Sequence, residues 1–154
     1  MKEKKSYTLK EIRDKLAAYC AYQDRCHLEV ENKMKKFYLA QEAEDDIMLY
    51  LMRENFLNEE RFAKSFARGK FYQKSWGRIK IKIELKRKHI TPRLIAEAMG
   101  EIDAEDYDKT MQKLIEKKMA TLNERDSYKK NQKVIRYMLQ KGYEYELIKA
   151  HLDL

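Results

Sequence analysis

The stretch Phe56–Pro92 decides the fold, and it reads FLNEERFAKSFARGKFYQKSWGRIKIKIELKRKHITP. Asn58 precedes two glutamates and an apolar run, which is the pattern of a helix N-terminus with carboxylates placed to favour the helix dipole. Gly77 separates this helix from the next one. Thr91-Pro92 opens another, because threonine caps well and proline loses nothing at the first helical position. The stretch therefore predicts three helices, near 58–74, near 77–89 and from 91 onward.

One segment inside this stretch carries the opposite periodicity. Residues 79–85, IKIKIEL, alternate strictly between apolar and polar side chains, as a half-buried strand does. A lone strand would have no neighbour to pair with, and the flanking residues predict helix. We therefore expect a helix here.

The same apolar pattern recurs on both sides of this stretch. Shifts of 51 and then 53 residues superpose three sets of apolar positions without a gap, including Val30 with Ile81 and Val134. Thr8 and Glu11 form a capping box that starts the first helix. The sequence thus predicts an all-α protein of three tandem three-helix repeats: residues 1–54 with a short N-terminal extension, 55–102 and 103–154. The remaining helices are expected near 8–22, 26–37, 41–54, 104–121, 127–141 and 144–152.

Composition supports this class and excludes others. Ala, Glu, Lys, Leu and Arg make up about half of the 154 residues, whereas one proline and four glycines are too few for an all-β fold. The two cysteines form no disulfide framework, and the three histidines have no ligand spacing. Nucleotide-binding and nucleophile motifs are missing. We therefore expect that the protein is not an enzyme and that it binds no metal and no cofactor. Because the N-terminus carries no apolar leader and no run reaches membrane length, we expect a cytoplasmic protein without a membrane segment.

The charge is concentrated in the middle unit. The chain has a net charge of +8, and residues 55–102 hold 12 bases against 5 acids, while the two flanking units are nearly neutral. Within the middle unit the bases recur at helical spacings on two successive helices and so form two stripes. Such a double stripe would follow phosphates or an acidic groove. The alternative is an ordinary solvated face. The nine candidate binding residues are Arg61, Lys64, Arg68, Lys70, Lys74, Arg78, Lys82, Lys86 and Arg87.

Aromatic residues lie between these bases. Phe62, Phe66 and Phe71 have near-helical spacing and are expected in the core. Trp76 falls in a connection between helices, where it is open to stacking on a nucleic-acid base.

Three segments resemble the RecX family of regulatory proteins. Residues 56–63, FLNEERFA, resemble the family pattern YLDDxRFA, and residues 77–90 resemble GxxxIxxELxxKGI. Residues 26–34 are similar to the first-repeat pattern SxxELxxKL, with Cys26 in place of the serine cap. His89 stands where the family usually has glycine, and Phe37 or Tyr38 stands there in the first unit, whereas Gly142 keeps the glycine in the third.

The resemblance implies an elongated, curved array that binds the RecA recombinase filament on DNA and inhibits its ATPase and strand exchange. It implies a modulator of homologous recombination, DNA repair and the SOS response, whose partners are the filament and the single- or double-stranded DNA within or near it. We expect a monomer. The alternative functions are a general nucleic-acid-binding module and, more weakly, an undetected enzyme. The residues alone do not distinguish inhibition from stimulation of the partner.

Overall fold

A computed structural model describes residues 6–154, and these residues are all-helical. The predicted fold class is confirmed: the described residues contain α-helices and one 3-10 turn, and no strand. Residues 1–5, which begin the predicted N-terminal extension, lie outside the described residues. The helices are α1 (Leu9–Tyr22), α2 (His27–Met34), the 3-10 turn η1 (Lys35–Phe37), α3 (Gln41–Arg53), α4 (Glu59–Tyr72), α5 (Arg78–Arg87), α6 (Pro92–Met99), α7 (Ala104–Thr121), α8 (Ser127–Lys141) and α9 (Tyr145–His151).

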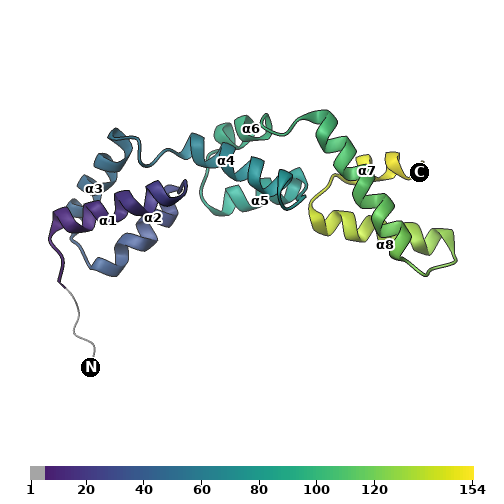
Figure 1. The fold of residues 1–154 in the computed structure, drawn as a ribbon, viewed down its shortest axis with the longest axis horizontal. Helices are drawn as coiled ribbons and strands as arrows, with labels where there is room; N and C mark the ends of the chain where they lie inside the picture. Colours follow the sequence, from purple (N-terminus) through teal and green to yellow (C-terminus); the bar gives the residue numbers. More distant parts are fainter. Residues whose placement is uncertain (1–5) are drawn as a thin grey trace, which may run out of the picture.

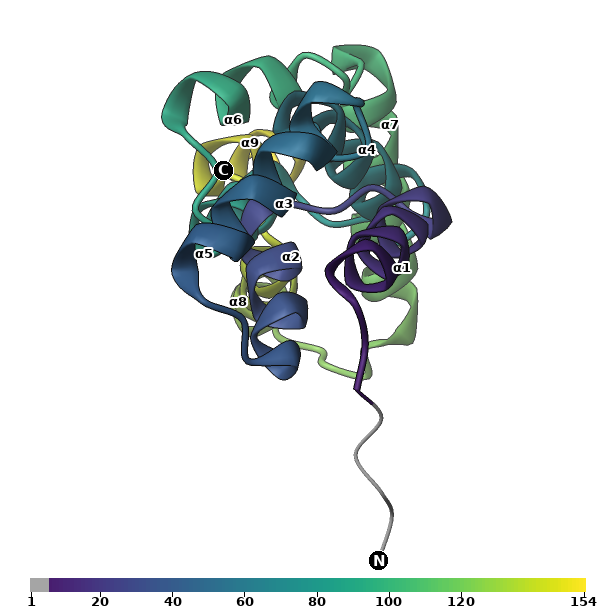
Figure 2. The ribbon, with the colours of Figure 1, turned by 90° about the vertical axis from the view of Figure 1, so that its left-hand side faces the viewer.

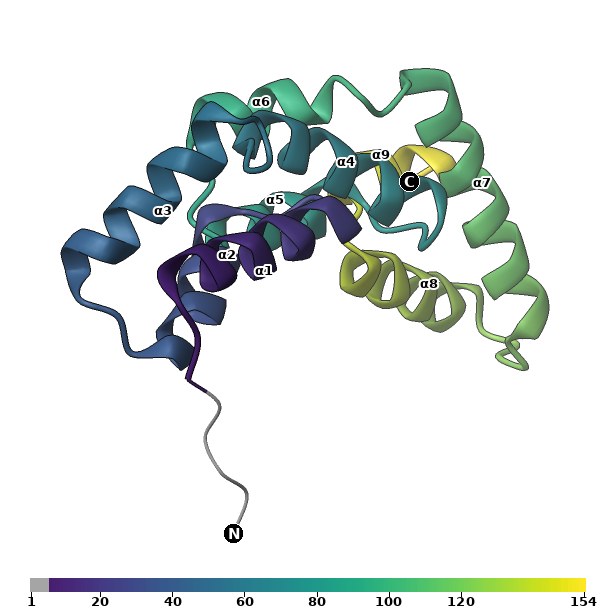
Figure 3. The ribbon, with the colours of Figure 1, turned by 60° about the vertical axis from the view of Figure 1, so that its left-hand side comes forward.

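The helices pack in three consecutive groups of three. Helices α1–α3, α4–α6 and α7–α9 each pack among themselves, and the groups follow one another along the long axis of the molecule (Figure 1). The end-on view places the groups one behind another, and an intermediate view shows the curve of the array (Figures 2 and 3). The proposed unit boundaries, 54/55 and 102/103, stay a prediction. We call the groups the first, middle and third units.

Local capping sets where the helices begin. The Thr8 hydroxyl accepts a hydrogen bond from the Glu11 backbone N–H at 3.1 Å, and the Glu11 carboxylate accepts one from the Thr8 N–H at 3.3 Å. Asn58 accepts from the Arg61 N–H at 2.9 Å at the start of α4. Thr91 caps α6 with proline at its first position. These predicted helix starts are confirmed.

The alternating segment 79–85 lies in α5, as expected. Ile81 and Leu85 are four residues apart, so they share one face of a helix and are fully buried. Ile79 and Ile83 lie off that face, and their exposed fractions are 41% and 46%. The strand-like alternation thus comes from placing isoleucine on both the buried and the exposed side of one helix.

A left-handed residue ends the second-helix segment of each unit. Tyr38, His89 and Gly142 have φ angles of 53°, 62° and 97°. They are separated by the same 51 and 53 residues that superpose the apolar patterns, so the backbone repeats with the sequence. Tyr38, rather than Phe37, therefore occupies the position where RecX proteins usually have glycine.

The three units share two hydrophobic cores. One core lies within the first unit and includes Leu16, Val30 and Leu51. The other is continuous through the middle and third units, where the tilted rings of Phe71, Tyr107 and Tyr143 pack in series with centroids 5.5 and 5.1 Å apart. Cys26 belongs to this second core although it precedes α2. The middle and third units are thus packed as one body, which the repeat pattern did not predict.

Backbone contact closes the junction between these two units. The Gly77 N–H donates to the Lys141 carbonyl at 2.7 Å, and the Ile79 N–H donates to the Gly142 carbonyl at 2.9 Å. A Cβ atom on Gly77 would lie 2.2 Å from the Gly142 carbonyl carbon. Only glycine permits this approach, because a backbone atom cannot move aside as a side chain does.

We predict that Gly77→Ala destabilises the protein by about 2–3 kcal/mol, because the added methyl group separates the two backbones. Gly69→Ala is the matched control: it lies inside α4 with nothing within 4 Å of an added Cβ. This change should stabilise by about 0.5–1 kcal/mol. Urea unfolding of both variants measures the difference, and equal stabilities would contradict the close junction.

Candidate functional site

The nine predicted bases are positioned by α4, α5 and the connection between these helices. The structure does not gather them into one surface: it divides them into bases that pair with carboxylates of this chain and bases that do not. The paired group comprises Arg61, Lys64, Arg68, Arg78 and Arg87, and the other comprises Lys70, Lys74, Lys82 and Lys86.

The three bases on one side of α4 are neutralised by carboxylates of this chain. Arg61, Lys64 and Arg68 line one shallow hollow of about 220 Å³, as their i, i+3, i+7 spacing predicts. Each forms an ion pair: the nitrogen–oxygen distances are 2.7 Å from Arg61 to Asp24, 2.9 Å from Lys64 to Glu60 and 3.1 Å from Arg68 to Glu101. The hydrogen bond with Lys64 lowers the pKa of Glu60 and raises the pKa of Lys64, so both stay charged.

Arg61 also holds the chain between the first and middle units. Its Nη2 donates to the carbonyl oxygens of Asn55 and Phe56 at 3.0 and 3.2 Å, while its Nε donates to Asp24. The same guanidinium thus ties the start of the middle unit to the α1–α2 connection. This is a structural use of a predicted binding residue.

Arg78 is occupied in the same way at the other junction. Its Nη1 lies 3.0 Å from Glu144, and its guanidinium lies 3.8 Å from the centroid of the Tyr107 ring. The Tyr107 hydroxyl donates to Glu144 and accepts from the Arg78 backbone N–H. Burial, and next the bond to Glu144, raise the pKa of Tyr107 well above its usual range, so the phenol remains a donor. Arg87 pairs with Glu84 on its own helix.

Two lysines, Lys70 and Lys80, flank the ring of Trp76. The ammonium groups of Lys70 and Lys80 lie 4.8 and 4.2 Å from the centroid of the indole ring, which is half-buried against the edge of Phe66. Lys141, at the end of α8, donates to the Lys74 carbonyl oxygen at 3.4 Å. Within residues 6–154 none of these lysines forms an ion pair. We call Lys70, Lys74, Trp76, Lys80 and Lys141 the Trp76 surface.

Two members of the Trp76 surface were missed by sequence reasoning. Lys80 was passed over because it lies outside the i, i+4, i+8 series of Arg78, Lys82 and Lys86. Lys141 is remote in sequence and arrives only through the contact of Gly142 with Gly77. The sequence did contain a signal for Lys80: it lies two residues from both Arg78 and Lys82, so on a helix it points about 200° away from them, toward Trp76. Nothing local indicated Lys141.

Lys82 and Lys86 lie on the other side of α5. They line a hollow between α5 and α6 together with apolar side chains of both helices. Neither lysine forms an ion pair within the described part of the chain. The predicted double stripe is therefore divided into two separate cationic surfaces and one hollow on α4 whose bases are paired with acids.

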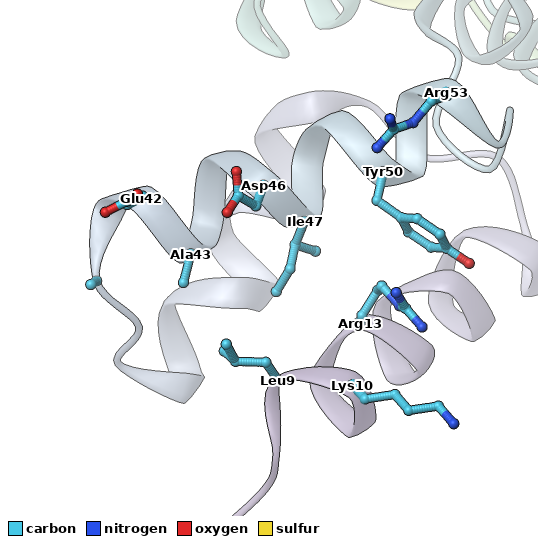
Figure 4. A pocket seen from close by; sticks show the side chains of 10 residues that line it. Leu9, Lys10, Arg13, Glu42, Ala43, Asp46, Ile47, Tyr50 and Arg53 are labelled. Carbon is cyan, nitrogen blue, oxygen red and sulfur yellow. The ribbon is translucent and has the colours of Figure 1, made fainter.

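A hollow in the first unit offers a different chemistry. It has a volume of about 640 Å³ and lies between α1 and α3, where Arg13 extends over the Tyr50 ring at 4.4 Å (Figure 4). Its lining residues include both bases and carboxylates, namely Lys10, Arg13 and Arg53 together with Glu42 and Asp46. Because its charges are mixed, it has no preference for a polyanion.

The cysteines and acids provide no metal centre in residues 6–154. Cys20 and Cys26 are free thiols, 4% and 0% exposed, and pack in the first and second cores respectively. Across the same residues no helix has the length and hydrophobicity that a membrane span requires.

Comparison with known proteins identifies the family. The family model described as "RecX, second three-helix domain" matches residues 58–99, and the one described as "RecX, third three-helix domain" matches residues 105–152. Together these matches span more than half of the chain. The chain belongs to the RecX family.

Relatives of known sequence and structure agree. The regulatory protein RecX of Clostridium perfringens strain 13 is 34% identical over 146 residues, which cover 94% of this chain and 59% of the relative. That of Clostridium botulinum strain Eklund 17B is 34% identical over 102 residues, covering 65% of this chain and 47% of the relative. The chain thus spans about half to three-fifths of the length of these relatives.

Solved structures confirm the helical repeat fold. The crystal structure of RecX from Lactobacillus salivarius superposes with a TM-score of 0.85 at 21% identity, covering 94% of both chains. A second crystal structure of a regulatory protein RecX superposes with a TM-score of 0.81 at 20% identity, covering 95% of this chain and 74% of that one.

Substitution of a paired base and of an unpaired base should have different effects on the stability of the protein. We predict that Arg61→Gln destabilises the protein by about 1–2 kcal/mol, because it removes the ion pair with Asp24 and leaves two carbonyl oxygens without this donor. Lys82→Gln should change stability by less than about 0.5 kcal/mol, since Lys82 has no such partner. Chemical denaturation measures both, and a neutral Arg61 variant would show that its contacts do not hold the junction.

The buried thiol of Cys26 makes the stability of the protein depend on pH in the alkaline range. Burial raises the pKa of its thiol from 9.0 to about 11, so between these values the unfolded chain loses this proton and the folded one keeps it. The free energy of unfolding should therefore fall as the pH rises above 9, by up to about 2 kcal/mol at pH 10.5. Cys26→Ser, which has no thiol, should lose less stability over the same range. Urea titrations of both proteins at pH 8 and 10.5 test this, and identical losses would rule it out.

Proposed function

We propose that this chain binds the RecA recombinase filament on DNA and inhibits its ATPase and strand exchange, thereby modulating homologous recombination, DNA repair and the SOS response. It acts as a cytoplasmic monomer and as a regulator rather than an enzyme. Membership of the RecX family of regulatory proteins supports this assignment. The curved, elongated array fits a partner that is itself a helical filament with a groove.

The Trp76 surface is the observation that carries the proposal. Its four lysines have no carboxylate partner in residues 6–154, so their charge is available to phosphates or to acidic side chains of the filament. The half-buried Trp76 adds an aromatic edge between two of these lysines. By contrast, Arg61, Lys64, Arg68, Arg78 and Arg87 pair with carboxylates of this chain, and two of them, Arg61 and Arg78, join neighbouring units.

The junction between the middle and third units supports the same role. Lys141 of α8 joins the surface only because Gly142 contacts Gly77. Trp76 packs against the continuous core, which fixes the backbone positions from which the four lysines extend. A preorganised cationic surface binds a polyanionic partner with less ordering cost than scattered mobile lysines do.

We predict that the triple variant Lys70→Glu, Lys74→Glu, Lys80→Glu raises the concentration needed for half-inhibition of the DNA-stimulated RecA ATPase by about tenfold or more, because attraction becomes repulsion. The salt dependence of inhibition should also flatten. A steady-state ATPase titration on single-stranded DNA at several salt concentrations measures both quantities.

A matched control separates local contacts from net charge. The variant Lys109→Glu, Lys113→Glu, Lys117→Glu makes the same charge change on one exposed face of α7, and these lysines also lack ion pairs within the described residues. It should inhibit nearly as well as the unchanged protein. If both folded triple variants lose inhibition equally, net charge and not the Trp76 surface is responsible.

The second candidate is a general nucleic-acid-binding module. The placement of Trp76 between Lys70 and Lys80 favours it, because aromatic rings among bases are a common platform for single strands. Binding to labelled single-stranded DNA, with and without recombinase and ATP, distinguishes the two functions. A filament regulator prefers the nucleoprotein filament, whereas a module binds bare DNA as tightly.

A further inference from the structure

The groove between α5 and α6 is the largest of the hollows described above, with a volume of about 880 Å³. Apolar side chains of both helices and of the connection between them line it: Ile83 from α5, Ile90 from the connection, and Ile95 and Met99 from α6. Ile83 is 46% exposed although it lies in the middle of a helix. Contiguous exposed apolar surface of this kind marks a place where another molecule covers it.

The edge of this groove is positively charged. Lys82 and Lys86 lie one helical turn apart on α5 and both line the groove, as does His89. No carboxylate lines it. Glu84 is engaged with Arg87, and Glu97 on α6 lies two residues from Ile95 and from Met99, which places it on the opposite side of its helix.

We propose that this groove binds an acidic amphipathic α-helix presented by the protein component of the filament; this inference rests on the proposed function and names the chemistry of its partner. Apolar residues on one face of the docked helix cover Ile83, Ile95 and Met99. Carboxylates one turn apart on the same helix pair with Lys82 and Lys86, whose spacing along α5 matches one helical turn. This is the helix-in-groove mode of recognition, in which apolar anchors provide the contact and edge charges set the orientation.

Nucleic acid is a poorer occupant of this groove. Phosphates need solvation or several cationic donors, and an apolar floor supplies neither. The groove is also separate from the Trp76 surface, because Lys80 and Lys82 are about 200° apart around α5. The chain therefore presents one surface suited to a polyanion and another suited to an acidic helix.

Photo-crosslinking from inside the groove tests this assignment. Ala96 lines the groove and is exposed, so benzoylphenylalanine in its place reports on the occupant without removing a lysine. The chain is irradiated with RecA assembled on single-stranded DNA with ATP, and the crosslinked peptide is located by mass spectrometry. We expect it in an acidic amphipathic helix of the recombinase.

Charge variants provide the control. Lys82→Glu, Lys86→Glu should lower the crosslink yield from position 96 by about tenfold, because both edge pairs become repulsive. Lys109→Glu, Lys113→Glu changes two lysines at the same spacing on α7, which line none of the hollows described above, and should leave the yield nearly unchanged.

The outcomes separate this inference from the proposed function. A chain that still inhibits RecA but crosslinks from position 96 to DNA, to a second copy of itself or to nothing overturns the groove assignment and leaves the proposed function standing. A basic or wholly apolar crosslinked segment overturns it as well. A chain that neither binds the filament nor inhibits the ATPase overturns both.

Discussion

The close approach of Gly77 to Gly142 is the contact on which the rest of the array depends. Two backbone hydrogen bonds cross it, and a side chain at either glycine would meet backbone or Lys80 atoms within 3.1 Å. This approach lets the Tyr143 hydroxyl reach the Ser75 carbonyl at 2.8 Å and sets Tyr107 beneath Arg78. It merges two repeats into one core and brings Lys141 beside Lys74.

The two junctions of the array are built from different interactions. The middle and third units meet through backbone hydrogen bonds and a shared apolar core, whereas the first unit buries Cys26 in that core and adds ion pairs across its own junction. Arg61 pairs with Asp24 across this joint, and Lys88 lies 3.9 Å from Glu29. Partly exposed ion pairs contribute about 0–1 kcal/mol each and weaken with salt. Salt therefore weakens the polar part of the junction between the first and middle units.

Much of the fold could be predicted from the sequence because its signals are local. Caps such as Thr8, Asn58 and Thr91 act on residues three positions away, and the apolar spacing of each helix is visible within a few turns. The merged core could not be predicted in this way, since Phe71 and Tyr143 are distant in sequence and each repeat looks self-contained.

The candidate site was less accessible to sequence reasoning for the same reason. Charge counting located the middle unit, but the fate of each base depends on partners far along the chain. Arg61 meets an acid 37 residues earlier and Arg78 one 66 residues later, so two of the nine predicted residues serve junctions. Lys80 and Lys141 entered the site through packing around Trp76 and the glycine contact. Helical spacing predicts which bases lie on the same side of a helix, but it does not predict which carboxylates from other elements will pair with them.

The central claim is that the Trp76 surface of the middle unit meets a nucleoprotein filament. Hydrogen–deuterium exchange of this chain, measured alone, with single-stranded DNA and with RecA assembled on that DNA with ATP, tests it most directly. The claim predicts added protection in residues 70–82 that requires the recombinase and exceeds any change with DNA alone. Protection confined to the first unit, or equally strong with bare DNA, would contradict it.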